Sequence, residues 1–266
     1  MRLNLVPPRT GLAWAKQGVR MFFKQPLAMS GLFFMFMALL SVASLLPLIG
    51  SALALALLPA ATLGLMAATQ EAERGHFPMP AILATAFRAG KQRARAMMVL
   101  GAYYAVSFLI LLGISTLLDG GEFARLYLFG GKITEEVVNR PAFQTAMWVT
   151  ILLYLPLSLM FWHAPALVHW HGITPAKSMF FSFMACWKNK GAFLVFGLVW
   201  MGLLLGVGLG ITLLATLLGS PEFAAVAMFP AVLVLVAMFF SSLYFTFRDC
   251  FVTDEISDEG LIKEIT

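Results

Sequence analysis

The sequence predicts an all-α membrane protein with six transmembrane helices in a single domain, residues 1–266. The chain is 61% hydrophobic and only 12% charged, whereas soluble domains carry roughly 25% charged residues. Six apolar segments contain no Asp, Glu, Lys or Arg, and each is close to or longer than the ~20 residues that cross the hydrocarbon layer as a helix. These segments are residues 26–46, 51–70, 96–118, 143–168, 191–219 and 223–247.

The first apolar segment is predicted to be a retained transmembrane helix. A cleaved signal peptide is the alternative, and its apolar region lies close to the start of a chain. Here the apolar run begins only at Pro26, and a second run follows almost at once.

The positive charges predict the orientation. Fifteen of the 18 lysines and arginines lie on the side of the predicted helices that holds both termini. The other side carries only Arg125, Lys132 and Arg140. The positive-inside rule therefore predicts cytoplasmic N- and C-termini in a bacterial inner membrane. The net charge of +5 is explained by this asymmetry, and no nucleic-acid partner is expected.

A short amphipathic helix is expected before the first crossing. Lys16, Arg20 and Lys24 are spaced four residues apart, so they form one basic stripe on a helix. Such a helix lies in the membrane interface and contacts anionic lipid headgroups. The alternative is a cytoplasmic extension of the first crossing helix.

Two further segments resemble this one. The first begins at Pro80 and runs to residue 95, and the second begins at Pro175 after a capping threonine. We expect their basic residues Arg88, Lys91 and Lys188 to contact headgroups as well.

These similarities predict three parallel repeats, each a surface helix plus a transmembrane hairpin, at about residues 8–75, 78–170 and 174–250. The alternative is coincidence among common helical residues. A Lys-Gln or Lys-Asn pair aligns the three surface segments, and a proline lies in each second crossing. The pairs are at 24–25, 91–92 and 188–189, and the prolines are Pro59, Pro156 and Pro230.

Two segments lie outside this pattern. Residues 119–144 are predicted to be an extracytoplasmic insertion containing a short helix. Residues 251–266 are predicted to be an acidic cytoplasmic tail.

The fifth crossing carries Gly202, Gly206 and Gly210 at successive four-residue intervals. Small residues at this spacing let helix backbones approach closely, so they predict helix packing. The packing partner is either another helix of the same chain or a second copy of it.

Residues 161–192 hold the densest set of polar aromatic side chains, including His163, His169, His171, Trp162 and Trp170. A metal site would require the three histidines to converge. On a regular helix His169 and His171 lie roughly 240° and 80° around from His163, so no single face presents all three. We interpret the set as interfacial residues, and as the first place to seek a polar interaction site.

No catalytic, cofactor-binding or metal-binding residues are predicted. The apolar segments lack the buried charges that coupled transporters use. The string Glu135-Glu136-Val-Val-Asn-Arg140 fits one protease motif, but its companion histidine motifs are missing. Cys186 and Cys250 are expected to be free, packed thiols.

Three strings resemble an uncharacterised family of multi-pass inner-membrane proteins of Gram-negative bacteria. They are VPPRTGLAW, LLPLIGSALALALLPAATLGLMAA and FWHAPALVHWHGITPAKSMFFSFMACWKN, which lie within residues 6–200. The resemblance implies a location and a topology, and it transfers no catalytic residue.

The leading functional interpretation is a non-enzymatic scaffold or accessory subunit of a membrane complex. It would contact membrane lipids and another membrane protein, or itself. The alternative is a transporter or channel for a lipid or small amphiphile, and an enzyme is third.

Overall fold

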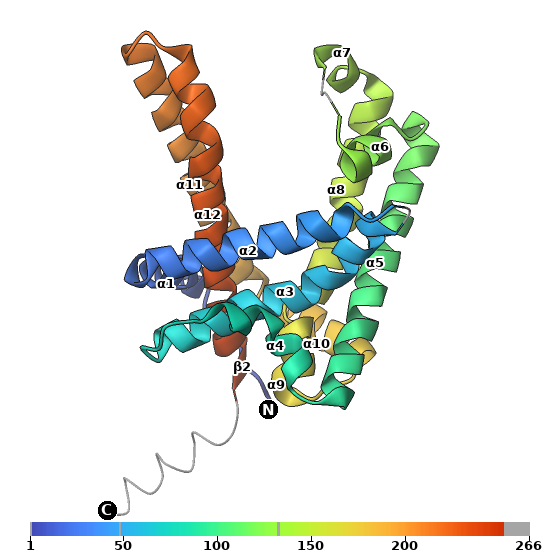
Figure 1. Ribbon diagram of the computed structural model, residues 1–266, viewed down its shortest axis with the longest axis vertical. Helices are drawn as coiled ribbons and strands as arrows, with labels where there is room; N and C mark the ends of the chain where they lie inside the picture. The colour runs from blue at the N-terminus through green and yellow to red at the C-terminus, as the bar shows by residue number, and fades with distance from the viewer. Residues whose placement is uncertain (1, 48, 132–133, 253–266) are drawn as a thin grey trace, which may run out of the picture. The chain divides into compact units, whose positions relative to one another are not determined.

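A computed structural model describes residues 2–47, 49–131 and 134–252, and these residues are almost entirely helical (Figure 1). One pair of two-residue strands accompanies the helices. In chain order the elements are β1 (Arg2–Leu3), α1 (Thr10–Lys24), α2 (Pro26–Ser44), α3 (Gly50–Glu73), the 3₁₀ helix η1 (Pro80–Ala84), α4 (Thr85–Arg88), α5 (Lys91–Asp119), α6 (Glu122–Phe129), α7 (Glu135–Val138), α8 (Pro141–Phe161), α9 (Ala164–His171), α10 (Pro175–Lys188), α11 (Lys190–Leu217), α12 (Pro221–Cys250) and β2 (Phe251–Val252).

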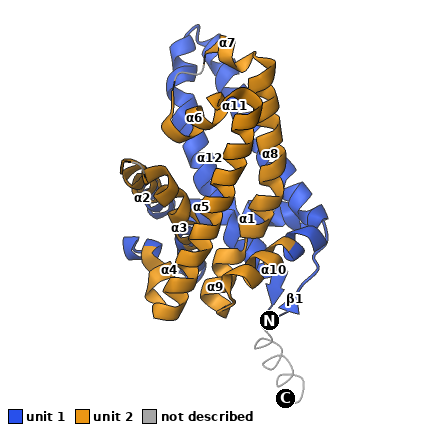
Figure 2. Cartoon of the chain, turned by 90° about the vertical axis from the view of Figure 1, so that its right-hand side faces the viewer, with its two compact units in different colours: residues 1–34, 64–83, 184–266 blue, residues 35–63, 84–183 orange. Residues whose placement is uncertain are grey.

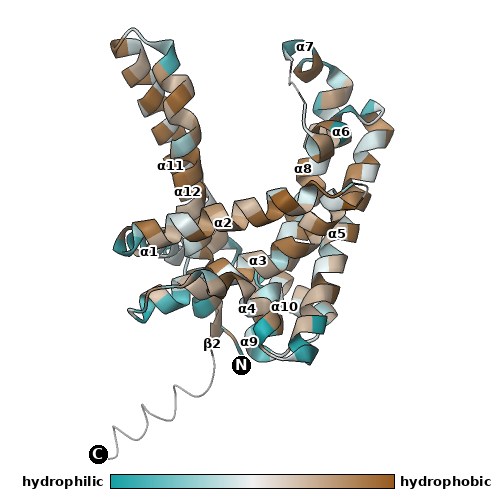
Figure 3. Ribbon diagram, viewed as in Figure 1, coloured by the Kyte–Doolittle hydropathy of each residue, from teal (hydrophilic) through white to brown (hydrophobic). Residues whose placement is uncertain are grey.

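Six of these segments are long and apolar enough to cross a membrane, as the sequence predicts. They are α2, α3, α5, α8 with α9, α11 and α12. Figure 3 shows that hydrophobic residues cover α11 and α12 along much of their length. Pro59, Pro156 and Pro230 lie inside α3, α8 and α12, and each helix continues past its proline.

The expectation of one basic helix over residues 80–95 is wrong. The segment begins as η1 and α4 and is interrupted at Gly90, whose φ of +97° is a left-handed value that ends helical backbone. Lys91 then starts α5, so the basic residues after Gly90 belong to the crossing helix. The second copy of the predicted repeat therefore lacks a continuous surface helix, and the threefold repeat stays a prediction.

The described residues form two compact units that interleave along the chain (Figure 2). Unit 1 contains residues 1–34, 64–83 and 184–266, and unit 2 contains residues 35–63 and 84–183. The predicted acidic tail lies outside the described residues from 253 onward, and its first two residues form β2.

In unit 1, α1 packs directly on α11 and α12. Two glycines permit this close approach. A Cβ on Gly11 would lie 2.1 Å from the Ala192 carbonyl oxygen, and one on Gly18 would lie 2.4 Å from the Ser242 Cβ. Trp14 lies between these glycines and is fully buried. β1 and β2 pair antiparallel, so the chain before α1 lies beside the chain after α12.

In unit 2, α5 packs against α8 and also contacts α4, α6 and α9. The backbone of α5 closely approaches the first half of α3, where a Cβ on Gly101 would lie 2.1 Å from the Ala56 oxygen. Aromatic rings fill the space between α5 and α8. Tyr104 packs edge-on against Phe161 at 5.0 Å between ring centroids, and Phe108 packs against Tyr154 at 5.8 Å.

The predicted insertion, residues 119–144, contains α6 and α7 and leads into α8. Asp119 accepts hydrogen bonds from the backbone N–H groups of Gly121 and Phe123 and so caps the start of α6. Arg140 forms ion pairs with Glu122 and Glu136. Glu136 and Arg140, both in the string that fits a protease motif, therefore form an exposed ion pair.

Candidate functional site

A cluster of charged side chains lies at one end of unit 1, where α3 and α12 end beside α1. Arg248 donates through Nη1 to Glu73, through Nη2 to the Gln17 Oε1 at 2.9 Å and through Nε to the Asp249 Oδ1 at 2.9 Å. Its guanidinium also lies 5.0 Å from the centre of the Phe245 ring. The planar guanidinium thus joins three helices through bonds that a lysine could not make together.

Trp14 anchors this cluster to the core of unit 1. Its indole Nε1–H donates to the Asp249 Oδ2 at 2.9 Å. The two oxygens of Asp249 are therefore shared between Trp14 and Arg248. Asn4 donates to the backbone oxygen of Asp249 at 2.9 Å and adds the N-terminal segment to the same site.

A cavity of about 780 Å³ opens beside this cluster, and we call it the α1 cavity. Its size falls within the range of about 300–1,000 Å³ that is usual for small-molecule sites. Its lining combines two cations, a carboxylate, a carboxamide and three apolar side chains: Gln17, Arg20, Met21, Phe23, Lys24, Glu73 and Phe245.

Two of the predicted headgroup-contacting residues line the α1 cavity, namely Arg20 and Lys24. Lys24 also donates to the Ala72 carbonyl oxygen at 2.9 Å, near the C-terminus of α3. A cation is favoured there because the last carbonyls of a helix carry partial negative charge. Lys16, Arg88, Lys91 and Lys188 are exposed and lie outside this cavity lining.

The predicted histidine site is dispersed around a helix break. α8 ends at Phe161 and α9 begins at Ala164, with Pro165 in its first turn, where a proline is well tolerated. His163 is fully buried at this break, and His169 is buried farther along α9. Among the described residues, the Nδ1 atom of His169 has no hydrogen-bond partner. His171, Trp162 and Trp170 are partly exposed.

Ser182 holds this break against α10. Its hydroxyl accepts from the His163 backbone N–H at 2.9 Å and donates to the Leu159 carbonyl at 2.7 Å. Both backbone groups lie beside the break between α8 and α9, so Ser182 bonds to the chain on each side of the break. Across the described ranges, no three His, Cys, Asp or Glu side chains are grouped closely enough to hold a metal ion.

Asn189 joins the two ends of unit 1 at the junction between α10 and α11. Its Oδ1 accepts from the Val6 backbone N–H at 2.9 Å, and its Nδ2 donates to the Asn4 carbonyl at 3.0 Å. The same Nδ2 contacts the Cys250 sulfur at 3.5 Å. Asn189 is 2% exposed; its contact with Cys250 is buried, and its bonds to Val6 and Asn4 are partly buried.

Gly202, Gly206 and Gly210 lie on an open face of α11. All three are exposed, and a Cβ built on any of them meets no atom within 4 Å. Glycines that do permit close helix approach include Gly11, Gly18 and Gly101.

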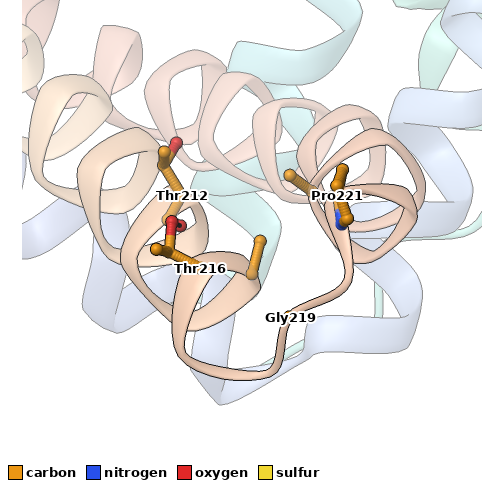
Figure 4. Close-up of a pocket in the computed structure, with 6 residues that line it drawn as sticks. Thr212, Thr216, Gly219 and Pro221 are labelled. Carbon is orange, nitrogen blue, oxygen red and sulfur yellow. Dashed lines mark hydrogen bonds between the residues drawn. The ribbon is translucent and has the colours of Figure 1, made fainter.

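A second hollow, of about 440 Å³, lies at the turn between α11 and α12 (Figure 4). Thr212, Thr216, Gly219 and Pro221 surround it, and its lining contains no ionisable side chain. Both threonine hydroxyls donate to carbonyls one turn earlier in α11 at 2.9 Å. Because its donors are satisfied locally, this hollow has less to offer a ligand than the α1 cavity.

Sequence reasoning missed Gln17, Glu73, Arg248 and Asp249 as site residues. Glu73, Arg248 and Asp249 flank apolar segments, where charged residues are expected as mere boundaries. The sequence offered one relevant pattern: an acidic residue, Glu73, ends one apolar segment, and a basic residue, Arg248, ends another. Nothing in the local sequence shows that these ends meet.

The six long apolar helices among the described residues are those of a helical integral membrane protein. The chain is 39% identical over 259 residues to the probable inner membrane protein BTH_II0599 of Burkholderia thailandensis, with 96% of each chain covered. The chain therefore belongs to the same family as that protein. No family model matches it, and no solved structure matches it.

Proposed function

We propose that this chain is a non-enzymatic scaffold or accessory subunit of an inner-membrane complex. The name of its relative supports the inner-membrane location. The open glycine face of α11 is the observation that carries the subunit proposal. α11 is largely exposed along its apolar length, whereas more than half of α3 is buried. An exposed glycine face of this kind suits a transmembrane helix of a partner protein.

A photo-crosslinking residue in α11 tests this proposal in native membranes. Leu209 lies roughly 60° from the centre of the glycine face, and Leu204 lies roughly 160° from it; both are exposed. We expect a discrete adduct with another membrane protein from a crosslinker at Leu209 and none from one at Leu204. The Leu209 adduct should be lost when Gly206→Ile places a large side chain on the glycine face. Equal adducts from both positions would refute the proposal, and an adduct of two copies would make the partner this chain itself.

The proposed orientation places both termini in the cytoplasm. The basic residues favour it, and the pairing of β1 with β2 supports an even number of crossings between them. Phe129 and His76 are exposed on opposite sides in this arrangement. An impermeant maleimide should label Phe129→Cys in intact cells and His76→Cys only after permeabilisation. The reverse pattern would invert the topology.

The threefold repeat is the other part of the proposed architecture. In its favour, α1 and α10 are both short helices that end at a lysine and lead into α2 and α11, respectively. Superposition of residues 8–75 on residues 174–250 in a structure of the protein in a lipid bilayer tests it. Helix hairpins that run in different directions after α1 and α10 are aligned would end the repeat proposal.

A lipid or amphiphile transporter is the second candidate, because the α1 cavity combines charged and apolar walls at the ends of spans. Reconstitution into vesicles with fluorescent phospholipids separates the two functions. Transbilayer movement that is faster than in protein-free vesicles and is slowed by Arg20→Gln would favour transport. Movement at the protein-free rate would favour the subunit.

A further inference from the structure

We propose that the α1 cavity binds the phosphodiester headgroup of an anionic phospholipid, with the acyl chains lying along the start of α2. The proposal goes beyond the scaffold function and holds whether or not a partner protein docks on α11. It follows from the charge, the hydrogen-bond donors and the position of the cavity.

Among the described residues, the charged groups that line or adjoin the cavity carry one more positive than negative charge. The carboxylates of Glu73 and Asp249 are both engaged with Arg248. Arg20 and Lys24 line the same cavity. These three cations and two carboxylates sum to one excess positive charge. A phosphodiester carries one negative charge and would balance it.

The donors also suit phosphate oxygens. Lys24 uses one N–H group on the Ala72 carbonyl, and its ammonium carries two more. Arg20 adds a guanidinium fork, which matches the spacing of two phosphate oxygens. Arg248 is already held by Glu73, Gln17 and Asp249, so it fixes the wall of the cavity and leaves the ligand to Arg20 and Lys24.

The position of the cavity favours a lipid over a soluble phosphate. α2 begins at Pro26, α3 ends at Glu73 and α12 ends at Cys250, so three apolar spans start or stop beside the cavity. This is the depth at which headgroups meet the hydrocarbon layer. Phe23 is 63% exposed and Leu27 is 88% exposed, and together they continue the apolar wall from the cavity onto α2.

The test uses the full chain in neutral detergent and measures its melting temperature during titration with a short-chain lipid. The probes are dioctanoylphosphatidylglycerol, dioctanoylphosphatidylcholine, glycerol 3-phosphate and inorganic phosphate. The variants are Arg20→Gln with Lys24→Gln, each single change, and Arg9→Gln as the matched control. Arg9 is an exposed cation at the start of the same helix that does not line the cavity.

We expect phosphatidylglycerol to raise the melting temperature at lower concentrations than phosphatidylcholine, whose own cation opposes the excess positive charge. The double variant should weaken this apparent affinity about 10-fold or more, while Arg9→Gln should change it less than about 2-fold. If the double variant does not fold, each single variant should still weaken binding by about 3-fold.

Three results would overturn the proposal. One is equal stabilisation of the unmodified protein by the two lipids. Another is unchanged affinity for phosphatidylglycerol in the folded variants of Arg20 and Lys24. The third is stabilisation by glycerol 3-phosphate or inorganic phosphate at the concentrations at which phosphatidylglycerol acts, because the ligand would then be soluble.

Discussion

Replacement of Asn189 by alanine should loosen the contact between the two ends of unit 1. The side chain makes two conventional hydrogen bonds, with Val6 and Asn4, and a longer contact with the Cys250 sulfur. Each buried hydrogen bond contributes about 1–1.5 kcal/mol net, and its loss also leaves the former partner poorly satisfied. The change should therefore cost about 2–3 kcal/mol of local stability.

Cys250 reports this loss directly, because its side chain is 0% exposed. A thiol reagent reaches such a sulfur only when the surrounding structure opens locally. A loss of 2–3 kcal/mol raises the open population, and so the labelling rate, by about 30- to 150-fold at 25 °C. The assay is maleimide labelling of Cys250 in a Cys186→Ala background at fixed pH, in neutral detergent.

Asn139→Ala is the matched control, because Asn139 is exposed in the turn after α7. It should leave the labelling rate of Cys250 unchanged. A rate within about 3-fold of the parent rate in the folded Asn189→Ala variant would show that the Asn189 contacts add less than about 0.7 kcal/mol. The hydrogen-bond reasoning would then be wrong.

Three further predictions rest on buried contacts. Ser182→Ala should lower the melting temperature in detergent by removing a hydroxyl that both accepts and donates at the α8–α9 break, at a cost of about 1–3 kcal/mol; an unchanged melting temperature would contradict it. Gly18→Ala should destabilise the chain by about 1–3 kcal/mol through overpacking, whereas Gly206→Ala should leave its melting temperature unchanged, because only Gly18 faces a neighbouring helix. Burial raises the pKa of the Cys186 thiol well above its ordinary value, so the thiol stays protonated, and it should resist alkylation at pH 8 until the chain unfolds; rapid alkylation of the folded chain would disprove this.

The six spans could be predicted because their signal is local. A run of about 20 residues without charge has few stable states outside a membrane, and helices are the only way to satisfy its backbone. These features depend on neighbours in sequence.

The charged cluster could not be predicted, because its members meet only after folding. Arg248 and Glu73 are separated by 175 positions in the chain. Each one alone is an ordinary charged residue at the end of a span. The packing of α1 could have been predicted more easily from the sequence. Gly11 and Gly18 are two turns apart with Trp14 between them, so they mark a packing face, but our prediction used only the basic stripe of the same helix.

The Lys-Gln and Lys-Asn pairs show how one local pattern serves different structural roles. Gln25 and Asn189 each follow the last residue of a short helix, where the backbone changes direction. Carbonyls and N–H groups near such a junction lack helical partners, and a side-chain amide can both donate and accept. Gln25 donates to the His76 carbonyl, and Asn189 bridges Val6 and Asn4.

Gln92 has no junction to bridge. Gly90 ends the preceding segment one residue before Lys91, so the amide is exposed in the first turn of α5. At the second joint, a glycine with positive φ lets the backbone change direction. At the other two joints, a side-chain amide bonds to the backbone groups where the direction changes. If the three units share one plan, Gly90→Ala should destabilise the α4–α5 joint, because alanine disfavours this backbone conformation. Hydrogen exchange at residues 85–95 would measure that loss of stability. Unchanged protection there would show that the second joint is built differently from the other two.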